Sequence, residues 1–176
     1  AHPSADIAYA DFTLIDEGGT ELGRSHVGPI DRLLHGNNVG ACFLYRARVT
    51  EALGGYDTRL FGVEDYDFWL RAAQRFGFVE LHEDLYIYRQ HGGSLTSQRT
   101  EQIRALTAEI VQRAIPAGLP GAEQSEILLG LAMKNRRQWR LDLIGRAFRA
   151  SPGHVARRLP QLARWSLAVA RNRLTA

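Results

Sequence analysis

The chain of 176 residues contains one cysteine, one methionine and one lysine, and it has no long apolar run. A single cysteine excludes a disulfide within the chain, so we expect a reducing cytoplasmic location. No segment approaches the ~20 apolar residues that a membrane-spanning helix needs. Cys42 lies in an apolar stretch and is predicted to be a small buried core residue, not a nucleophile. The chain begins without methionine or a charged leader, and this start predicts the interior of a longer protein.

Charge is distributed very unevenly along the chain. Residues 1–133 contain 11 arginines and 18 acidic residues, so this part has a net charge of −7. Residues 134–176 contain ten arginines, one lysine and one aspartate, which gives +10. The overall charge of +3 hides this asymmetry, and the two parts need separate explanations.

The order of the predicted elements indicates an α/β region followed by helices alone. Apolar patterns bounded by turn residues predict strands at residues 7–15, 20–27, 39–45, 78–81 and 85–88. Helical patterns are present at residues 30–35, 46–53, 64–76, 100–115, 122–150 and 154–174. We expect a mixed sheet with flanking helices over residues 1–97 and a helical region over residues 98–176. The run at 39–45 is predicted to be a strand that is buried on both faces.

Three carboxylates lie within four positions where a glycine-containing loop meets a predicted helix: Glu64, Asp65 and Asp67. Adjacent acids repel each other, but a helix N-terminus favours negative charge through its exposed N–H groups and its dipole. The helix should keep Asp65 ionised, while the charge of Glu64 acts in the opposite direction. Both side chains are expected at the cap or first turn, facing the space beside the loop. Helix capping alone is the alternative explanation.

A second polar cluster follows the last predicted strand, as Arg89-Gln90-His91-Gly92-Gly93-Ser94-Leu95-Thr96. Arginine is a strong donor to phosphate oxygens, and histidine is both a metal ligand and an acid or base near neutral pH. The glycine pair allows the backbone to approach a ligand closely. Together with the upstream acids, this cluster suits a metal-bound diphosphate and a general base. A surface turn with a solvated histidine is the alternative.

Two ordered stretches closely resemble family 2 glycosyltransferases of the GT-A fold. They run from Gly54-Gly55-Tyr56-Asp57 through the acidic helix to Arg71, and from Leu85 to Thr96. The strand Ala8-Tyr9-Ala10-Asp11-Phe12 is similar to the segment that follows the metal-binding D-x-D of that family. The resemblance covers about residues 2–97. It implies the acceptor-side half of a GT-A domain, with the nucleotide-binding half before residue 1.

The resemblance also implies an activity, cofactor and partners. The activity is an inverting transfer of a sugar from a nucleotide-diphospho-sugar to a hydroxyl of a glycan or lipid-linked acceptor, in cell-surface polysaccharide synthesis. It requires a divalent metal, Mg²⁺ or Mn²⁺, as a Lewis acid on the leaving group. We do not expect this chain to be active alone, because the donor-binding half is lacking.

Residue roles follow from the same resemblance. Asp65 matches the catalytic base, and Glu64 would bind the acceptor or support the base. His91 matches the metal ligand, while Arg89 and Ser94 would contact the donor diphosphate. The sugar or acceptor pocket is assigned to three further residues: Asn38, Gly40 and Trp69.

Several polar or aromatic residues are predicted to be structural. Asp65-Tyr66-Asp67 spells D-x-D, but residues two apart on a helix point in different directions, so Asp67 is expected to contact an arginine instead. A place in the core is the alternative to a pocket role for Trp69. Asp11 is expected near the sheet edge, and His82 in a solvated turn.

The basic C-terminal segment has two interpretations. Its helices either pack on the catalytic region with a solvated arginine face, or bind an anionic bilayer peripherally through residues 154–176. The inner face of the plasma membrane, where a lipid-linked acceptor would be found, is the expected surface. No recognised motif accompanies the charge, so no nucleic-acid partner is expected.

Two other functions stay open at this point. One is a non-catalytic module that binds a membrane or partner through the basic helices. The other is a metal hydrolase that uses Glu64, Asp65 and His91.

Overall fold

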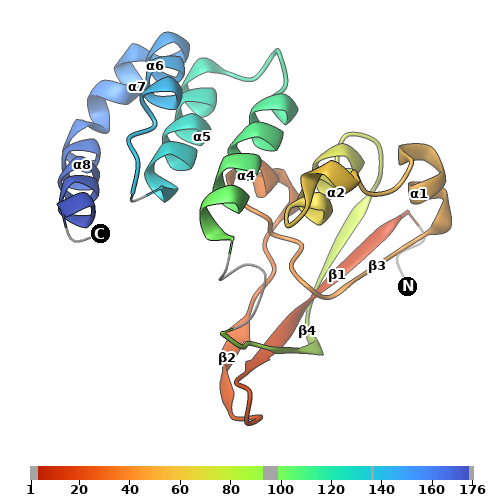
Figure 1. Cartoon of the computed structure of the whole chain (residues 1–176). Helices are drawn as coiled ribbons and strands as arrows, with labels where there is room; N and C mark the ends of the chain where they lie inside the picture. Colours follow the sequence, from red (N-terminus) through yellow and green to blue (C-terminus); the bar gives the residue numbers. More distant parts are fainter. Residues whose placement is uncertain (1–3, 93–98, 136, 175–176) are drawn as a thin grey trace. The chain divides into compact units, whose positions relative to one another are not determined.

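The computed structural model describes residues 4–92, 99–135 and 137–174 of the chain (Figure 1). These residues form two compact units, residues 1–107 and residues 108–176. The division falls within one helix, α4 (Thr100–Ala114). The first unit contains a sheet and helices, which confirms the predicted α/β class, and the second contains helices alone.

The sheet of the first unit is built around β1 (Ile7–Ile15). Along one edge β1 pairs in parallel with β4 (Phe78–Arg89). On its other edge it pairs antiparallel with β3 (Phe43–Tyr45) and then with β2 (Glu21–Ser25). The result is a four-stranded mixed sheet with β1 at its centre (Figure 1).

The first strand and its hairpin confirm the sequence prediction. Ile7, Tyr9 and Phe12 are buried, and so are Ala10 and Asp11, which suits a central strand covered on both faces. The turn after β1 is closed by Asp16, whose carboxylate accepts a hydrogen bond of 2.8 Å from the Thr20 amide. Gly19 has a φ of 92°, a left-handed conformation that suits glycine in such a turn.

The prediction for residues 39–45 is wrong in extent and in burial. Only Phe43–Tyr45 is a strand, it pairs with β1 alone in the described part of the chain, and Leu44 is 76% exposed. Gly40 interrupts the extended backbone with a φ of 71°. Cys42 is therefore only half-buried instead of lying in the core, although burial still raises the pKa of its thiol.

The predicted turn at residues 82–84 is also wrong, because β4 continues through it. Ala10 pairs with Leu81 and Phe12 pairs with Tyr86, so residues 82–85 all lie opposite Asp11. A bulge accommodates extra residues while pairing continues on both sides. His82 lies in this bulge with an exposed side chain, so its predicted solvation is confirmed although its turn is not.

Helices of the first unit follow the predicted order. They are the 3₁₀ helix η1 (Ile30–His35), α1 (Ala47–Leu53), the 3₁₀ helix η2 (Thr58–Leu60) and α2 (Glu64–Ala72). The helix α1 ends as expected, with Gly54 in the left-handed region. The helix α2 ends at Ala72, earlier than the predicted stop at Gly77. It buries Phe68, Trp69 and Ala72 completely.

The second unit contains the end of α4 and four further helices. These are α5 (Gly121–Lys134), α6 (Leu141–Ala150), α7 (Pro152–Arg157) and α8 (Leu159–Leu174). Buried Asn135 shapes the connection between α5 and α6, because its side chain accepts from the amides of Arg137 and Gln138, both at 2.9 Å. Its carbonyl accepts from the Trp165 indole of α8 at 2.7 Å. No helix in the described part of the chain has both the length and the apolar character to cross a membrane.

Candidate functional site

Asp65 lies in the first turn of α2, as predicted, and its carboxylate is half-buried. One oxygen accepts a hydrogen bond of 2.6 Å from the Tyr66 amide, and the other accepts one of 3.1 Å from the side-chain amide of Asn37. No arginine, lysine or histidine among the described residues forms an ion pair with Asp65. The carboxylate is therefore held by neutral donors only.

Burial is the main influence on the protonation of this carboxyl. It raises the pKa of Asp65, and the negative charge of Glu64 raises it further. Hydrogen bonds from the Tyr66 amide and Asn37 lower the pKa, but they do not cancel the effect of burial. The sequence predicted opposite effects of the helix terminus and of Glu64 on the pKa of Asp65, but it did not predict this burial. A carboxylate with a raised pKa is a better proton acceptor near neutral pH.

Glu64 turns back toward the loop that precedes it. Its carboxylate accepts a hydrogen bond from the Gly62 amide, and Gly62 has a φ of 90°. A Cβ added at Gly62 would lie 3.1 Å from Ile103, so the loop also passes close to α4 in the first unit. In this conformation Glu64 supports the loop beside Asp65.

Tyr56 is a neighbour of the acids that the sequence analysis did not assign to the site. Burial raises the pKa of Tyr56 to about 12, and nearby Tyr45, Asp65 and Glu64 contribute to this rise. Its hydroxyl therefore keeps its proton at neutral pH, and a hydrogen bond with the Tyr45 side chain is one cause of the raised pKa. The only sequence signal was its place in the Gly54-Gly55-Tyr56-Asp57 motif.

Asn37 is the second residue that the sequence analysis did not assign. It follows Gly36, which ends η1, and η1 is fixed to α2 by a hydrogen bond from the Tyr66 hydroxyl to the Leu33 carbonyl. The adjacent Asn38, predicted for the pocket, instead donates to the Pro29 carbonyl at 3.2 Å. An asparagine pair after a helix stop was the available signal, but only the fold shows which side chain reaches the acid.

Gly40 and Trp69, the other two residues assigned to the pocket, have structural surroundings. A Cβ at Gly40 would lie 2.7 Å from the Phe12 ring, so a close approach as well as a positive φ requires glycine there. Trp69 is 0% exposed, and its ring centroid lies 4.7 Å from that of Phe43. The core interpretation of Trp69 fits this burial, and the ring offers no surface to a sugar in this structure.

Two of the residues assigned to the diphosphate and metal are described: Arg89 ends β4, and His91 follows it by two positions. The Arg89 guanidinium donates to the carbonyls of Asp16 and Glu17 in the β1–β2 turn, at 3.0 and 2.8 Å. His91 is exposed, and Ser94 lies outside the described residues. Among the described residues, no hydrogen bond or ion pair joins Arg89 or His91 to the acidic pair.

A complete metal site is not formed by the residues that the structure describes. They include no group of three or more histidine, cysteine or acidic side chains placed to hold a metal ion. His91 could supply one ligand from this chain, since its side chain is exposed.

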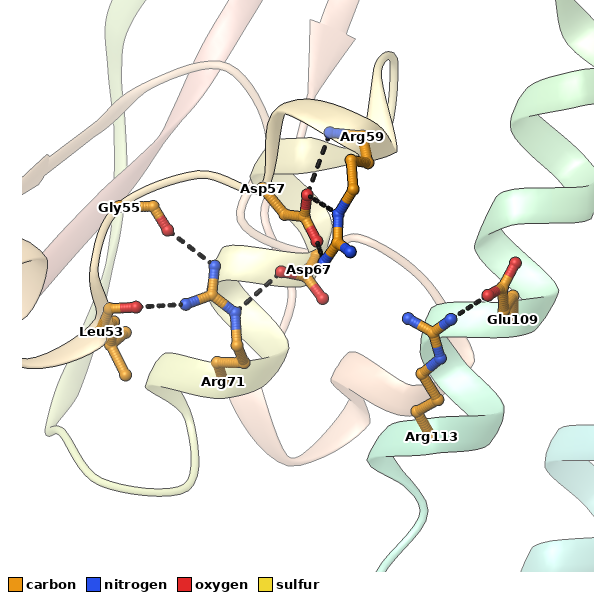
Figure 2. A network of polar contacts seen from close by, with 8 residues as sticks. All are labelled: Leu53, Gly55, Asp57, Arg59, Asp67, Arg71, Glu109 and Arg113. Atoms are coloured by element: carbon orange, nitrogen blue, oxygen red, sulfur yellow. Dashed lines mark hydrogen bonds and ion pairs between the residues drawn. The ribbon is translucent and has the colours of Figure 1, made fainter.

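Asp67 makes the arginine contact that the sequence predicts. Figure 2 shows Arg71 of α2 between Asp67 and the end of α1, with its Nε 2.8 Å from the Asp67 carboxylate. The same guanidinium donates to the carbonyls of Leu53 and Gly55, at 2.9 and 2.8 Å. The second acid of this D-x-D is therefore part of a structural connection between two helices.

Asp11 lies on the central strand and is 4% exposed, so its predicted place near the sheet edge is wrong. Its carboxylate contacts His26 Nδ1 at 2.8 Å, the Val27 amide at 2.9 Å and His82 Nδ1 at 3.6 Å. Burial alone would raise the pKa of Asp11, but the contacts with His26, Val27 and His82 outweigh it, so the pKa is lowered. This cluster is distinct from the acidic helix and holds the β2 end and the β4 bulge against β1.

No family model and no curated protein matches the chain. Its function is therefore inferred from the residues and their geometry.

Proposed function

We propose that this chain is the acceptor-side half of an inverting, metal-dependent glycosyltransferase that uses a nucleotide-diphospho-sugar. The observation that carries the proposal is the carboxylate of Asp65, which is half-buried, unpaired with a cation in the described chain and held in place by Asn37. The ordered motifs at residues 54–71 and 85–96 support the same function. The GT-A fold is part of this proposal, and the mixed α/β architecture is compatible with it.

In the proposed reaction, Asp65 accepts the proton of the acceptor hydroxyl. The acceptor oxygen forms a bond to the anomeric carbon from the face opposite the diphosphate. The bond from that carbon to the diphosphate oxygen breaks, and its electron pair leaves with the diphosphate. A base with a raised pKa suits the first of these changes, because it holds the transferred proton more firmly.

Neighbouring residues would position the acceptor and the base. The side-chain amide of Asn37 donates a hydrogen bond to one carboxylate oxygen of Asp65, which would hold the base in one orientation toward the acceptor. Tyr56 is protonated and its hydroxyl is hydrogen-bonded to Tyr45, so its oxygen would accept a hydrogen bond from an acceptor sugar. Glu64 holds the loop through the Gly62 amide.

A divalent metal belongs to the proposal as the group that would neutralise the leaving diphosphate. The described residues do not form its site by themselves, so His91 is the proposed contribution of this chain. Arg89 and Ser94 stay proposed diphosphate contacts.

Replacing Asp65 by asparagine in the full-length protein tests the assignment. We expect sugar transfer to fall by about 10²–10⁴-fold, the usual contribution of a general base. Binding of the nucleotide-diphospho-sugar, measured by calorimetry, should be unchanged. The matched control is Asp67→Asn, the same chemical change two positions along the helix, which should retain transfer. Near-normal transfer by Asp65→Asn would contradict the proposal.

A second candidate function is supported by the outer face of α8. Leu167 is 72% exposed and lies one turn from exposed Arg164, in a part of the chain with strong positive charge. Such a face suits peripheral binding to an anionic bilayer. Because α7 and α8 bury Val155, Trp165 and Val169, removing residues 154–176 would disturb the fold, and point substitutions are the better test.

The test compares sedimentation of the full chain with phosphatidylglycerol vesicles for Leu167→Asp, Arg164→Gln and the unchanged protein. Weaker binding of both variants supports a membrane-surface role. Equal binding by all three excludes this face of α8.

A further inference from the structure

A cavity of about 420 Å³ lies within the second unit, between the last turn of α4, the loop to α5 and the end of α6. Its polar lining consists of Gln112, Gln124, Arg146 and Arg149. No acidic side chain is among its lining residues in the described chain. The cavity is therefore a positively charged pocket in a unit that the proposed transfer reaction does not use.

The exposed guanidinium of Arg146 is oriented at this cavity by one side-chain partner. Its guanidinium donates to the side-chain oxygen of Gln112. The nitrogen of the same amide donates to the Ala108 carbonyl at 2.8 Å, which fixes the amide against α4. A guanidinium oriented by a neutral amide keeps its full charge and has further N–H groups for a ligand.

The charges of Arg146 and Arg149 are not balanced within the described part of the second unit. Neither residue forms an ion pair there. Arg113, Arg140 and Arg158 of the same unit do pair, with Glu109, Asp142 and Glu126. Two unpaired guanidinium groups at one cavity favour an anionic occupant.

The carbonyl end of α6 helps to explain its two arginines. Helix C-termini favour cations, so Arg146 and Arg149 near this end stabilise the helix. The start of α5 packs against the same end, because a Cβ at Gly121 would collide with the Ala150 carbonyl oxygen. Neither Gly121 nor Ala122 is among the lining residues of the cavity, so its donors to a ligand are side chains.

We propose that this cavity binds a phosphate group of a small molecule or of a lipid. A guanidinium can bind two phosphate oxygens with parallel hydrogen bonds. The amide nitrogens of Gln112 and Gln124 each donate one hydrogen to a backbone carbonyl, and the second hydrogen of each is left for a remaining phosphate oxygen. The site is independent of Asp65, so it can fail while the proposed transferase function holds, and the reverse.

The test is calorimetric titration of the full chain with inorganic pyrophosphate, beside sedimentation with vesicles of phosphatidic acid and of phosphatidylcholine. We expect Arg146→Gln/Arg149→Gln to weaken binding by about tenfold or more, since charge-assisted hydrogen bonds to phosphate are about twice as strong as neutral ones. The control is Arg32→Gln/Arg137→Gln, which removes the same charge from exposed positions that neither line the cavity nor belong to α8. It should bind as the unchanged chain does.

Binding of pyrophosphate alone identifies a free phosphorylated ligand, and binding of phosphatidic acid vesicles alone identifies a lipid headgroup. If the double variant does not fold by circular dichroism, Gln112→Leu replaces it, because this change removes the amide that orients Arg146 and would bind a phosphate oxygen, and it should weaken binding while keeping both arginines. The proposal is overturned if neither probe binds, or if binding is equally weakened in the control.

Discussion

Asp65 and Asp67 stand two residues apart on the same helix, yet their surroundings have little in common. Asp67 is paired with Arg71, and that arginine also binds two carbonyls at the end of α1. Asp65 has no cationic partner in the described chain and is held by an amide and the backbone. One carboxylate has its charge balanced in a structural connection, whereas the other is left half-buried with a raised pKa.

The difference shows how a helix separates two roles within one acidic motif. Residues two apart point about 200° away from each other around a helix axis, because each residue turns the chain by ~100°. Asp67 therefore faces α1, while Asp65 faces the loop that contains Asn37. Spacing alone makes the motif look like a metal-binding pair, and the direction of the side chains argues against it.

The largest expected effect on stability comes from Arg71→Met. This change removes three hydrogen bonds that connect α2 to itself and to the end of α1, so we expect the free energy of unfolding to fall by about 3 kcal/mol. Urea denaturation followed by circular dichroism measures it. The control Arg75→Met removes one hydrogen bond of 3.3 Å to Ala52 and should cost less than about 1 kcal/mol. Equal losses of unfolding free energy in the two variants would contradict a larger contribution from the three hydrogen bonds of Arg71.

A smaller loss is expected for Asp67→Asn. The amide oxygen can still accept from Arg71, but the charge of the ion pair is lost, so the free energy of unfolding should fall by about 1.5 kcal/mol. The same denaturation measurement applies. A gain in stability would show that the ionised carboxylate of Asp67, like that of Asp65, destabilises the fold.

The opposite sign is expected for Asp65→Asn. The pKa of Asp65 in the folded protein lies above its unfolded value, so the ionised carboxyl destabilises the fold at neutral pH. Protonation removes this penalty as the pH falls through the folded pKa. The variant should therefore be more stable than the unchanged protein at pH 7, and this gain should shrink in acid. Unfolding curves at pH 7 and pH 4 measure it, and a gain that grows in acid would contradict the sign.

The smallest change in stability is expected for Asn37→Ala, about 0.5 kcal/mol. Its hydrogen bond lowers the pKa of Asp65, so its loss should raise that pKa further. The acidic limb of the pH–rate profile of sugar transfer should move to higher pH. Asn38→Ala removes a bond to the Pro29 carbonyl and should leave the profile in place. If the profile also stays in place for Asn37→Ala, Asn37 does not influence the pKa of the catalytic base.

Local sequence patterns predicted the elements whose causes are themselves local. The strand β1 was predicted with its observed bounds because apolar residues recur among small and polar ones before a turn, and α1 ends at Gly54 because glycine readily adopts the left-handed conformation there. The run at residues 39–45 misled, since its composition is that of a buried strand, while Gly40 has a positive φ against the Phe12 ring and the strand begins only at Phe43. The β4 bulge depends on pairing with β1, which a local pattern does not contain.

The site was predictable only in part for the same reason. The acidic helix start placed Asp65 and Glu64 correctly, because helix termini and glycine loops are local signals. The burial that raises the pKa of Asp65 and the contact with Asn37, 28 positions away, arise only when η1 and α2 pack together. Arg89 reaches the turn of the β1–β2 hairpin, a contact across 73 positions that no motif indicated.

Trp69 gives the acidic helix an optical reporter. It is the one tryptophan of residues 1–107, and Trp139 and Trp165 both belong to the second unit. Its ring is fully buried among aromatic side chains, and its indole nitrogen has no hydrogen-bond partner in the described structure. An indole in such surroundings emits at short wavelength. With the other two tryptophans replaced by phenylalanine, a red shift of the emission would follow the opening of α2, four residues from the Asp65 carboxylate.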